Sequence, residues 1–411
     1  MKKKRLLFVI NTLGMGGAEV ALLRLLRCID PAAYDIDLYV MLGQGELIDR
    51  LPPYVRLVNH TFHPIDVLSS KGRRCLLKTV LRSCLVRCSL LKNAGYLAKN
   101  LIRMRKSGRV HADKLLWKVV ADSAPMPEKH YDLAVAFLEG GSTYFVATHV
   151  RARRKVAFLH ISYSEAGNSA DLDQGCYDYF DQVFCVSNEV RASFLSAYPN
   201  YAGKTRVFHN ILSPSEIRER SQEGEGFSDA FPGRRILTVC RLVPQKKLEV
   251  SVEAMRLLKQ REDLPEVRWY VMGEGRSRAR LEKAIYRDGL EGCFVLMGTR
   301  DNPYPYFKEA DIYVHCTAYE GKSVAVEEAQ ILSKPVIVSD APGNRDQVKD
   351  GYDGMLVPLE AERIAEAVSW MLLNPSAAKQ MGLRASQRDF SGGDLALLLE
   401  GGPAPAEALC S

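Results

Sequence analysis

Two glutamates, Glu320 and Glu328, are the residues whose type and spacing first suggest chemistry. Glu320 follows the short β-branched run 310–315, so we expect it in a loop after a strand. Glu328 falls in the helix expected next, on the same stripe as Val324 and Ile331, which should face the sheet. A buried carboxylate costs several kcal/mol unless it has a partner. We expect that partner to be either Arg or Lys of a neighbouring strand, in a structural ion pair, or a ligand hydroxyl.

The stretch between the two glutamates has the composition of an anion site. Gly321 frees the backbone to approach another group closely. The amides of Gly321, Lys322 and Ser323 lie at the start of the expected helix, where they would present a positive dipole to an anion. The sequence therefore predicts a phosphate cradle with a carboxylate on each side.

Two cations follow the strand expected over 235–240. Arg241 stands at the carboxyl end of that strand, and Lys246 begins a helix that runs to residue 260. Two fixed cations at such positions can neutralise a pyrophosphate. The alternative is an exposed salt bridge for both residues. Because Lys247 follows directly, the sequence leaves open which lysine reaches the phosphate.

The first domain offers a glycine turn and a histidine. Gly16 and Gly17 lie between the strand expected over 6–10 and a helical run, which is a phosphate-binding arrangement in a doubly wound sheet. The third glycine of a dinucleotide motif is absent, so a plain tight turn is the alternative. His160 ends the strand expected over 155–159, where binding groups gather, although histidines also pack structurally at strand ends.

Strands and helices alternate along the chain in a pattern that predicts an α/β protein. Its 411 residues exceed one usual core, so we expect two doubly wound, Rossmann-like domains. The predicted units are residues 1–210 with a basic helical insertion at 66–121, a linker at 211–233, a second domain at 234–374, a helix at 375–390 that crosses back, and a disordered tail at 391–411.

The net charge of +7 is unevenly distributed. Residues 71–118 contain fourteen Lys and Arg against one acid, Asp113, and leucines recur there at spacings of three and four residues. Cationic amphipathic helices suggest contact with anionic lipid headgroups, and a solvated basic face is the alternative. Nucleic acid is disfavoured, because no aromatic residues interleave with the charges.

The N-terminus and the cysteines suggest a cytoplasmic protein. Residues 1–11 have a basic head but only five apolar residues before Asn11, too few for a signal peptide or a membrane span. The ten cysteines have no regular spacing, as expected for free thiols. Cys84 and Cys88 are one helical turn apart, but no second pair completes a metal site, so we expect no metal.

Five separated places resemble the retaining GT-B glycosyltransferases of family 4, the group 1 type. They are Gly16-Gly17, His160, Arg241 with Lys246, Gly298, and Glu320 with Glu328. The run Asn302 to Tyr306 resembles bacterial polysaccharide and wall-polymer members. The resemblance implies a GT-B fold, in which two Rossmann-like domains face each other across a cleft.

The resemblance also implies roles for the charged residues and the histidine. Glu320 would contact the donor sugar, Glu328 the nucleotide ribose, and His160 another sugar hydroxyl. Arg241 and Lys246 would stabilise the charge that builds on the departing phosphate.

The glycine loops would contact the donor mainly through the backbone. Gly16 and Gly17 would face it from the first domain. The corners at Gly273 and at Gly298 with Thr299 would approach the nucleobase.

The resemblance implies a retaining hexosyltransferase without cofactor or metal. It would move a hexose or amino sugar from a nucleotide-sugar to a lipid-linked or polymer glycan acceptor, on the cytoplasmic face of the membrane, in surface polysaccharide synthesis. One alternative is another reaction on the same architecture, such as epimerisation or phosphorolysis. A second is a non-catalytic protein that binds a nucleotide-sugar beside a synthase.

Overall fold

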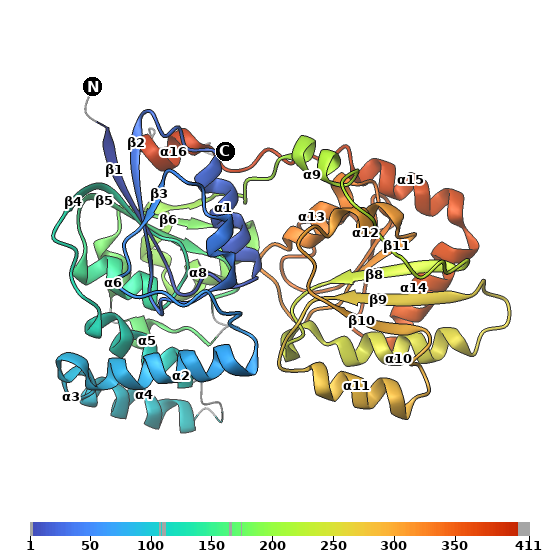
Figure 1. Ribbon diagram of the computed structural model, residues 1–411, viewed down its shortest axis with the longest axis horizontal. Coiled ribbons are helices and arrows are strands. Elements are labelled where there is room, and N and C mark those ends of the chain that lie inside the picture. Colours follow the sequence, from blue (N-terminus) through green and yellow to red (C-terminus); the bar gives the residue numbers. More distant parts are fainter. Residues whose placement is uncertain (1–2, 107, 109–111, 164–166, 174, 402–411) are drawn as a thin grey trace.

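The computed structural model describes residues 3–401 except 107, 109–111, 164–166 and 174. It contains two parallel sheets, each covered by helices on both faces (Figure 1). The first sheet has the strand order β3-β2-β1-β4-β5-β6-β7, and the second has the order β10-β9-β8-β11-β12-β13. In each sheet the strand that comes first in the chain, β1 or β8, lies in the interior of the sheet. It pairs in parallel with a neighbour on each side, as in doubly wound folds.

The strands of the first sheet are β1 (Lys4–Ile10), β2 (Tyr34–Val40), β3 (Val55–Leu57), β4 (His130–Ala136), β5 (Arg151–Leu159), β6 (Gln182–Cys185) and β7 (Thr205–Val207). The strands of the second sheet are β8 (Arg234–Val239), β9 (Val267–Met272), β10 (Phe294–Gly298), β11 (Ile312–His315), β12 (Val336–Ser339) and β13 (Met355–Val357).

The helices of the first domain are α1 (Gly17–Arg27), α2 (Ser70–Leu85), α3 (Ser89–Lys92), α4 (Ala94–Lys106), α5 (Ala112–Ser123), α6 (Gly141–His149), α7 (Ala170–Asp173) and α8 (Asn188–Ala197). Those associated with the second domain are α9 (Pro214–Arg220), α10 (Leu248–Lys259), α11 (Arg278–Arg287), α12 (Tyr304–Glu309), α13 (Val324–Ile331), α14 (Ala361–Leu373) and α15 (Pro375–Ala385). The last helix is α16 (Leu395–Glu400).

Strand β1 explains the layering of the first domain. Its run from Leu6 to Ile10 is buried throughout, as expected for a parallel strand with helices on both faces. Leu7 and Val9 join one core, with side chains of α6 and α8. Phe8 joins the opposite core, together with α1. The strand therefore fixes α1 on one face of the sheet, and the turn before α1 at the carboxyl edge.

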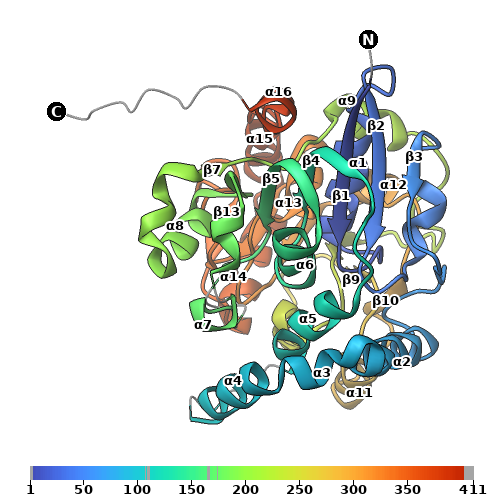
Figure 2. The ribbon, with the colours of Figure 1, turned by 90° about the vertical axis from the view of Figure 1, so that its left-hand side faces the viewer.

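The basic insertion forms a helical layer that packs against the first domain through α5 and α6. Helices α2 to α5 lie together at one edge of the first domain, in both ribbon views (Figures 1 and 2). Within it, residues 107 and 109–111 lie outside the described part of the chain. The predicted linker contains α9, which contacts α12 and α13 of the second domain.

The C-terminal segment differs from the prediction. Helix α15 packs against α13 and α14, so residues 375–385 stay with the second domain. The chain crosses back later, and α16 lies on the first domain, where Leu398 is fully buried (Figure 1). The predicted disordered tail is therefore wrong for Leu395–Glu400, because the leucines of this helix pack into the core of the first domain that also contains Phe8 and α1. Residues 402–411 of that prediction lie outside the described residues.

Candidate active site

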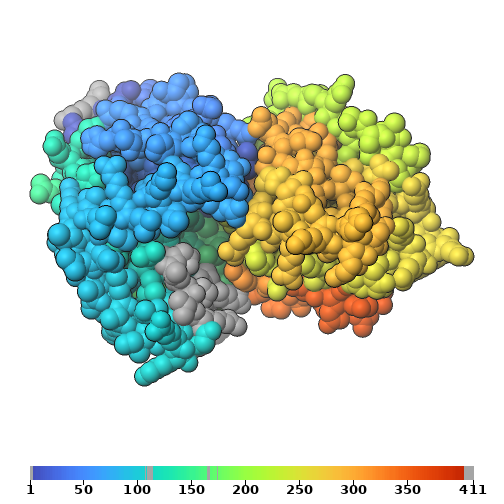
Figure 3. All heavy atoms as spheres, turned by 60° about the horizontal axis from the view of Figure 1, so that its bottom comes forward, coloured from blue at the N-terminus to red at the C-terminus, as the bar shows by residue number. Residues whose placement is uncertain are grey.

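A cavity of about 760 Å³ lies between the domains, which form two lobes in the space-filling view (Figure 3). Its wall on the first domain includes the start of α1 and the side chain of Arg24. Its wall on the second domain comes from the carboxyl ends of the strands and from α13. The predicted site residues that line it are Gly16, Gly17, Arg241, Lys246, Gly273, Thr299, Glu320, Lys322, Ser323 and Glu328.

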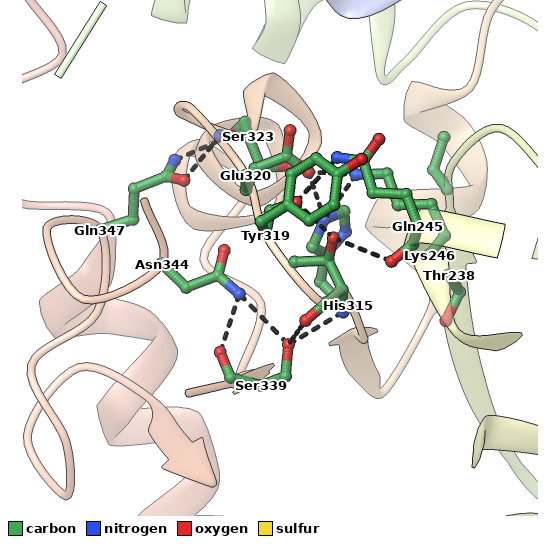
Figure 4. Close-up of polar contacts among 12 residues, drawn as sticks. Thr238, Gln245, Lys246, His315, Tyr319, Glu320, Ser323, Ser339, Asn344 and Gln347 are labelled. Carbon is green, nitrogen blue, oxygen red and sulfur yellow. Dashed lines mark hydrogen bonds and ion pairs between the residues drawn. The ribbon is translucent and has the colours of Figure 1, made fainter. Parts of the chain in front are cut away.

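Lys246, Glu320 and His315 form a charged cluster in this cavity (Figure 4). Lys246 forms an ion pair with Glu320 through Oε2. The Nε2 atom of His315 lies 3.1 Å from the Lys246 ammonium and 3.3 Å from the same carboxylate oxygen. Tyr313 Oη lies 3.2 Å from His315 Nδ1 at the end of β11. The cluster thus connects the end of β11 with Lys246, in the segment after β8, and with Glu320, in the loop after β11.

The protonation states in the cluster follow from its burial and its charges. Burial alone would raise the pKa of Glu320, but the Lys246 ammonium and His315 outweigh it and hold that pKa below its usual value. Burial, reinforced by the Lys246 charge, lowers the pKa of His315 to about 4. At neutral pH the cluster therefore contains a carboxylate, an ammonium and a neutral imidazole.

The structure distinguishes the two adjacent lysines. Lys246 is buried in the short helical turn η5 (Pro244–Lys246) and lines the cavity. Lys247 is exposed, with a positive φ of 45° at the start of α10. Arg241 is also exposed and lines the same cavity. Lys246 rather than Lys247 is therefore the lysine that lines the cavity.

The predicted phosphate cradle is only partly available. The amide of Ser323 donates to Gln347 Oε1 at 2.7 Å (Figure 4). Lys322 forms an ion pair of 2.6 Å with the buried Glu327. At Gly321 a Cβ atom would lie 1.8 Å from the carbonyl oxygen of His160, so glycine allows the two domains to approach each other. The cradle prediction is therefore wrong for the Ser323 amide, because a side chain distant in sequence already occupies it.

Glu328 has a partner, and that partner comes from the opposite domain. Its Oε1 accepts from Arg24 Nη2 at 2.6 Å and from Tyr304 Oη at 3.0 Å. Arg24 Nη2 also donates to Tyr304 Oη at 2.7 Å. The sequence predicts a strand residue as the partner in a structural ion pair, whereas Arg24 belongs to α1. Sequence reasoning missed Arg24 and Tyr304, because nothing local to α1 indicates which helix lies opposite it.

His160 lies at the end of β5, behind Gly321 rather than in the wall of the cavity. Burial lowers its pKa to about 3, so the imidazole is neutral. Its ring lies 4.9 Å from that of Phe137. Its Nε2 atom is buried and has no hydrogen-bond partner among the described residues. The structure therefore fits either alternative, a packed histidine or one whose free nitrogen meets a sugar.

The two glycine corners meet each other. Gly273 and Gly298 form an isolated bridge, in which the amide of Gly273 donates to the carbonyl oxygen of Gly298 at 2.9 Å. A Cβ atom at Gly273 would lie 1.9 Å from the carbonyl oxygen of Cys240, which leaves no room for a side chain. Gly298 has a φ of +74°, and Thr299 follows it into the cavity wall. Gly273 and Thr299 therefore line the cavity, whereas Gly298 lies behind them, and their approach to a nucleobase stays a prediction.

A family model described as "Glycosyl transferases group 1" matches residues 230–388. The amylovoran biosynthesis glycosyltransferase AmsK of Erwinia amylovora is 35% identical over 150 residues, which are 34% of this chain and 36% of AmsK. The UDP-Gal:alpha-D-GlcNAc-diphosphoundecaprenol alpha-1,3-galactosyltransferase of Escherichia coli is 31% identical over 122 residues, 29% of this chain and 32% of that enzyme. This chain thus spans about a third of the length of these two relatives.

Solved structures resemble the chain over nearly its whole length. HepE of Anabaena in complex with UDP-glucose has a TM-score of 0.65 at 18% identity, covering 96% of each chain. The sucrose-phosphate synthase of Thermosynechococcus elongatus has a TM-score of 0.65 at 16% identity, covering 94% of each chain. At these identities the likeness concerns the fold alone, and the predicted GT-B architecture of two facing Rossmann-like domains is confirmed.

Proposed function

We propose that this chain, whose residues 230–388 match the family model of the group 1 glycosyl transferases, is a retaining glycosyltransferase. It would move a hexose or an amino sugar from a nucleotide-sugar to a lipid-linked or glycan acceptor in surface polysaccharide synthesis. The observation that carries this proposal is the convergence of Arg241, Lys246, Glu320 and Glu328 on one interdomain cavity. They come from separate loops and helices, and their charges suit a sugar diphosphate.

The charges of the cavity fit the demands of glycosyl transfer. Such a reaction passes through an oxocarbenium-like state while negative charge builds on the departing diphosphate. Arg241 and Lys246 would stabilise that charge, and fixed charges of this kind usually make the largest contribution. Lys246 and His315 both contact Oε2 of Glu320, which leaves Oε1 to accept from a sugar hydroxyl.

Retention would follow if the departing phosphate takes the proton of the acceptor hydroxyl. The phosphate and the attacking oxygen then lie on the same face of the sugar, so the new bond keeps the configuration of the old one. His160 would orient another sugar hydroxyl through its free Nε2. The reaction would need no divalent ion, because two cations of the chain itself neutralise the diphosphate.

The acceptor would reach the site from a membrane surface. In the described residues, no helix combines the length and the apolar character that a membrane span requires. Helix α2 nevertheless exposes Leu77, Leu81 and Leu85, at spacings of one helical turn. Exposed Lys78 and Arg82 lie beside these leucines. This combination suits a helix that lies in the headgroup region of an anionic leaflet, peripheral to the cytoplasmic face.

A direct experiment tests the proposed function. The purified protein is screened with UDP-, GDP- and ADP-sugars by thermal shift, and the best donor is incubated with a polyprenyl-diphosphate-linked sugar. We expect one donor to raise the melting temperature and to yield a product whose new anomeric centre, by NMR, matches that of the donor. An inverted product would refute retention. Donor binding without transfer to any glycan or lipid-linked acceptor would favour the non-catalytic alternative.

A further inference from the structure

Arg24 reaches across the cavity from α1 to a carboxylate of the second domain. Its Nη2 atom donates to Glu328 Oε1 at 2.6 Å and to Tyr304 Oη at 2.7 Å. The side chains of Arg24 and Glu328 are only 11% and 9% exposed. The ion pair of Arg27 of α1 with Glu216 is longer, at 3.8 Å, and more open. The Arg24 pair is therefore a desolvated contact within the site.

The guanidinium is only half satisfied. Arg24 Nη1 is buried and has no hydrogen-bond partner among the described residues, although the side chain lines the cavity. A buried donor without an acceptor is costly, and more so when the group is charged. Glu328 has the complementary deficit, because both of its hydrogen bonds to the residues that the structure describes involve Oε1 and leave Oε2 to accept. A free donor and a free acceptor thus lie on one ion pair beside the cavity.

A hydroxyl group satisfies both atoms at once, since it has one hydrogen to donate and lone pairs that accept. We propose that Arg24 is a donor-binding residue supplied by the first domain: a ribose hydroxyl of the nucleotide donates to Glu328 Oε2 and accepts from Arg24 Nη1. This inference rests on the proposed function, in which Glu328 binds the ribose. It adds that the ribose subsite is complete only when α1 and α13 are apposed.

The experiment measures the coupling between Arg24 and the ribose hydroxyls. Binding of UDP, GDP and ADP is measured by calorimetry, each beside its 2′-deoxy and 3′-deoxy forms. The proteins are the wild type, Arg24→Gln and Arg24→Lys, with Arg27→Gln as the matched control on the same helix. Arg24→Lys keeps a positive charge near Glu328, and so keeps the test open if Arg24→Gln does not fold.

We expect the wild type to bind one deoxy form about tenfold more weakly than its parent nucleotide, the size expected for a charge-assisted hydrogen bond. In both Arg24 variants this penalty should fall to about threefold or less, whereas Arg27→Gln should keep it. An Arg24 variant that folds and keeps the full penalty would overturn the inference. The inference would also fail if the wild type bound both deoxy forms as tightly as the parent nucleotide. If the wild type binds none of the three nucleotides, the proposed function fails as well.

Discussion

At the scale of single residues, burial distinguishes side chains of the same type that are adjacent in the sequence. Lys246 and Lys247 are neighbours, but only Lys246 is buried and paired with Glu320. Arg241 stays exposed in the same cavity. A buried ammonium beside a carboxylate is held rigidly, so it can meet a developing phosphate charge without reorganising.

Replacing either cation should therefore slow the reaction. We expect Arg241→Ala or Lys246→Ala to reduce turnover by two orders of magnitude or more, about 3 kcal/mol of transition-state stabilisation. Lys247→Ala is the control and should stay within about threefold of the wild type, a difference of well under 1 kcal/mol. Initial rates of sugar transfer at saturating donor provide the measurement. Near-normal turnover by an Arg241 or Lys246 variant would remove that residue from the phosphate role.

The same two cations lead to a prediction about metal dependence. If Arg241 and Lys246 neutralise the diphosphate, chelation should leave the reaction intact. We expect transfer in the presence of excess EDTA to proceed at the rate seen with added Mg²⁺. A loss of activity that Mg²⁺ or Mn²⁺ restores would contradict the prediction.

His315 should make stability depend on pH. Burial and the Lys246 charge lower its pKa from 6.5 to about 4, so below pH 6.5 protons bind the unfolded chain preferentially. Its contribution is complete above pH 6.5 and is lost as the pH falls towards 4. Between pH 8 and pH 5 the loss is about 2 kcal/mol.

Asp173 acts in the opposite direction, since burial raises its pKa to about 7, so His315 has to be isolated by difference. Urea unfolding of the wild type and His315→Gln at several pH values supplies that difference. The free energy of unfolding of the wild type, minus that of the variant, should fall by about 2 kcal/mol from pH 8 to pH 5. A difference that does not change with pH would show that the imidazole is not held neutral.

At the scale of elements, α2 is unusual because it exposes apolar side chains on a basic helix. Leu77, Leu81 and Leu85 are 58%, 56% and 80% exposed, and α3 adds Leu91 at 75%. Exposed leucines at successive turns form a stripe, and the exposed Lys78 and Arg82 each follow one of them in sequence. Within the described residues this helix therefore has the features of an interfacial element rather than of a core helix.

Vesicle binding should depend on both features of α2. The wild type should co-sediment with vesicles containing phosphatidylglycerol, and raising the salt from about 0.1 M to about 0.5 M should weaken the binding. The double variant Leu81→Gln, Leu85→Gln should bind about tenfold more weakly, because it loses apolar area that the membrane would bury. Leu373→Gln alters a leucine of α14 that is 49% exposed, and serves as the control. Equal binding to neutral vesicles, or none at all, would exclude this surface.

At the scale of the whole molecule, α16 ties the end of the chain to the first domain. Leu398 is fully buried there. Arg154 of β5 donates to the carbonyl oxygens of Leu398 and Leu397 at 2.6 Å and 3.0 Å. Gly393 donates its amide to the carbonyl oxygen of His209 at 2.8 Å. The chain thus connects the two domains twice, at the linker and at this return segment.

Removing the buried side chain of α16 should destabilise the first domain. We expect Leu398→Ala to lower its free energy of unfolding by about 2–5 kcal/mol, the usual cost of truncating a buried leucine. Leu383→Ala, in an exposed leucine of α15, should change it by less than about 0.5 kcal/mol. Denaturant unfolding followed by the fluorescence of Trp117, with the other two tryptophans replaced, would report on this domain. Equal effects of the two variants would show that α16 does not stabilise it.

The sequence by itself determined the elements and the order of the chemistry along them. Short apolar runs bounded by turn residues, such as Leu6 to Ile10, favour parallel strands covered on both faces, so the doubly wound sheets were predictable. The positions of Arg241 after one such strand and of Lys246 in the turn that follows it were predictable from the same pattern. The strands and the positions of the two cations depend on residues that are close in sequence, so the local pattern of apolar and polar residues predicts them.

Only the tertiary structure decided which groups meet from distant segments. The partner of Glu328 is Arg24, 304 residues earlier in the chain, and the Ser323 amide is taken by Gln347. The burial of Leu398 likewise depends on the folded core of the first domain, against which it packs. Such contacts depend on how two domains and a returning segment are apposed. No periodicity within one element encodes that apposition, because its free energy comes from surfaces that the chain brings together only on folding.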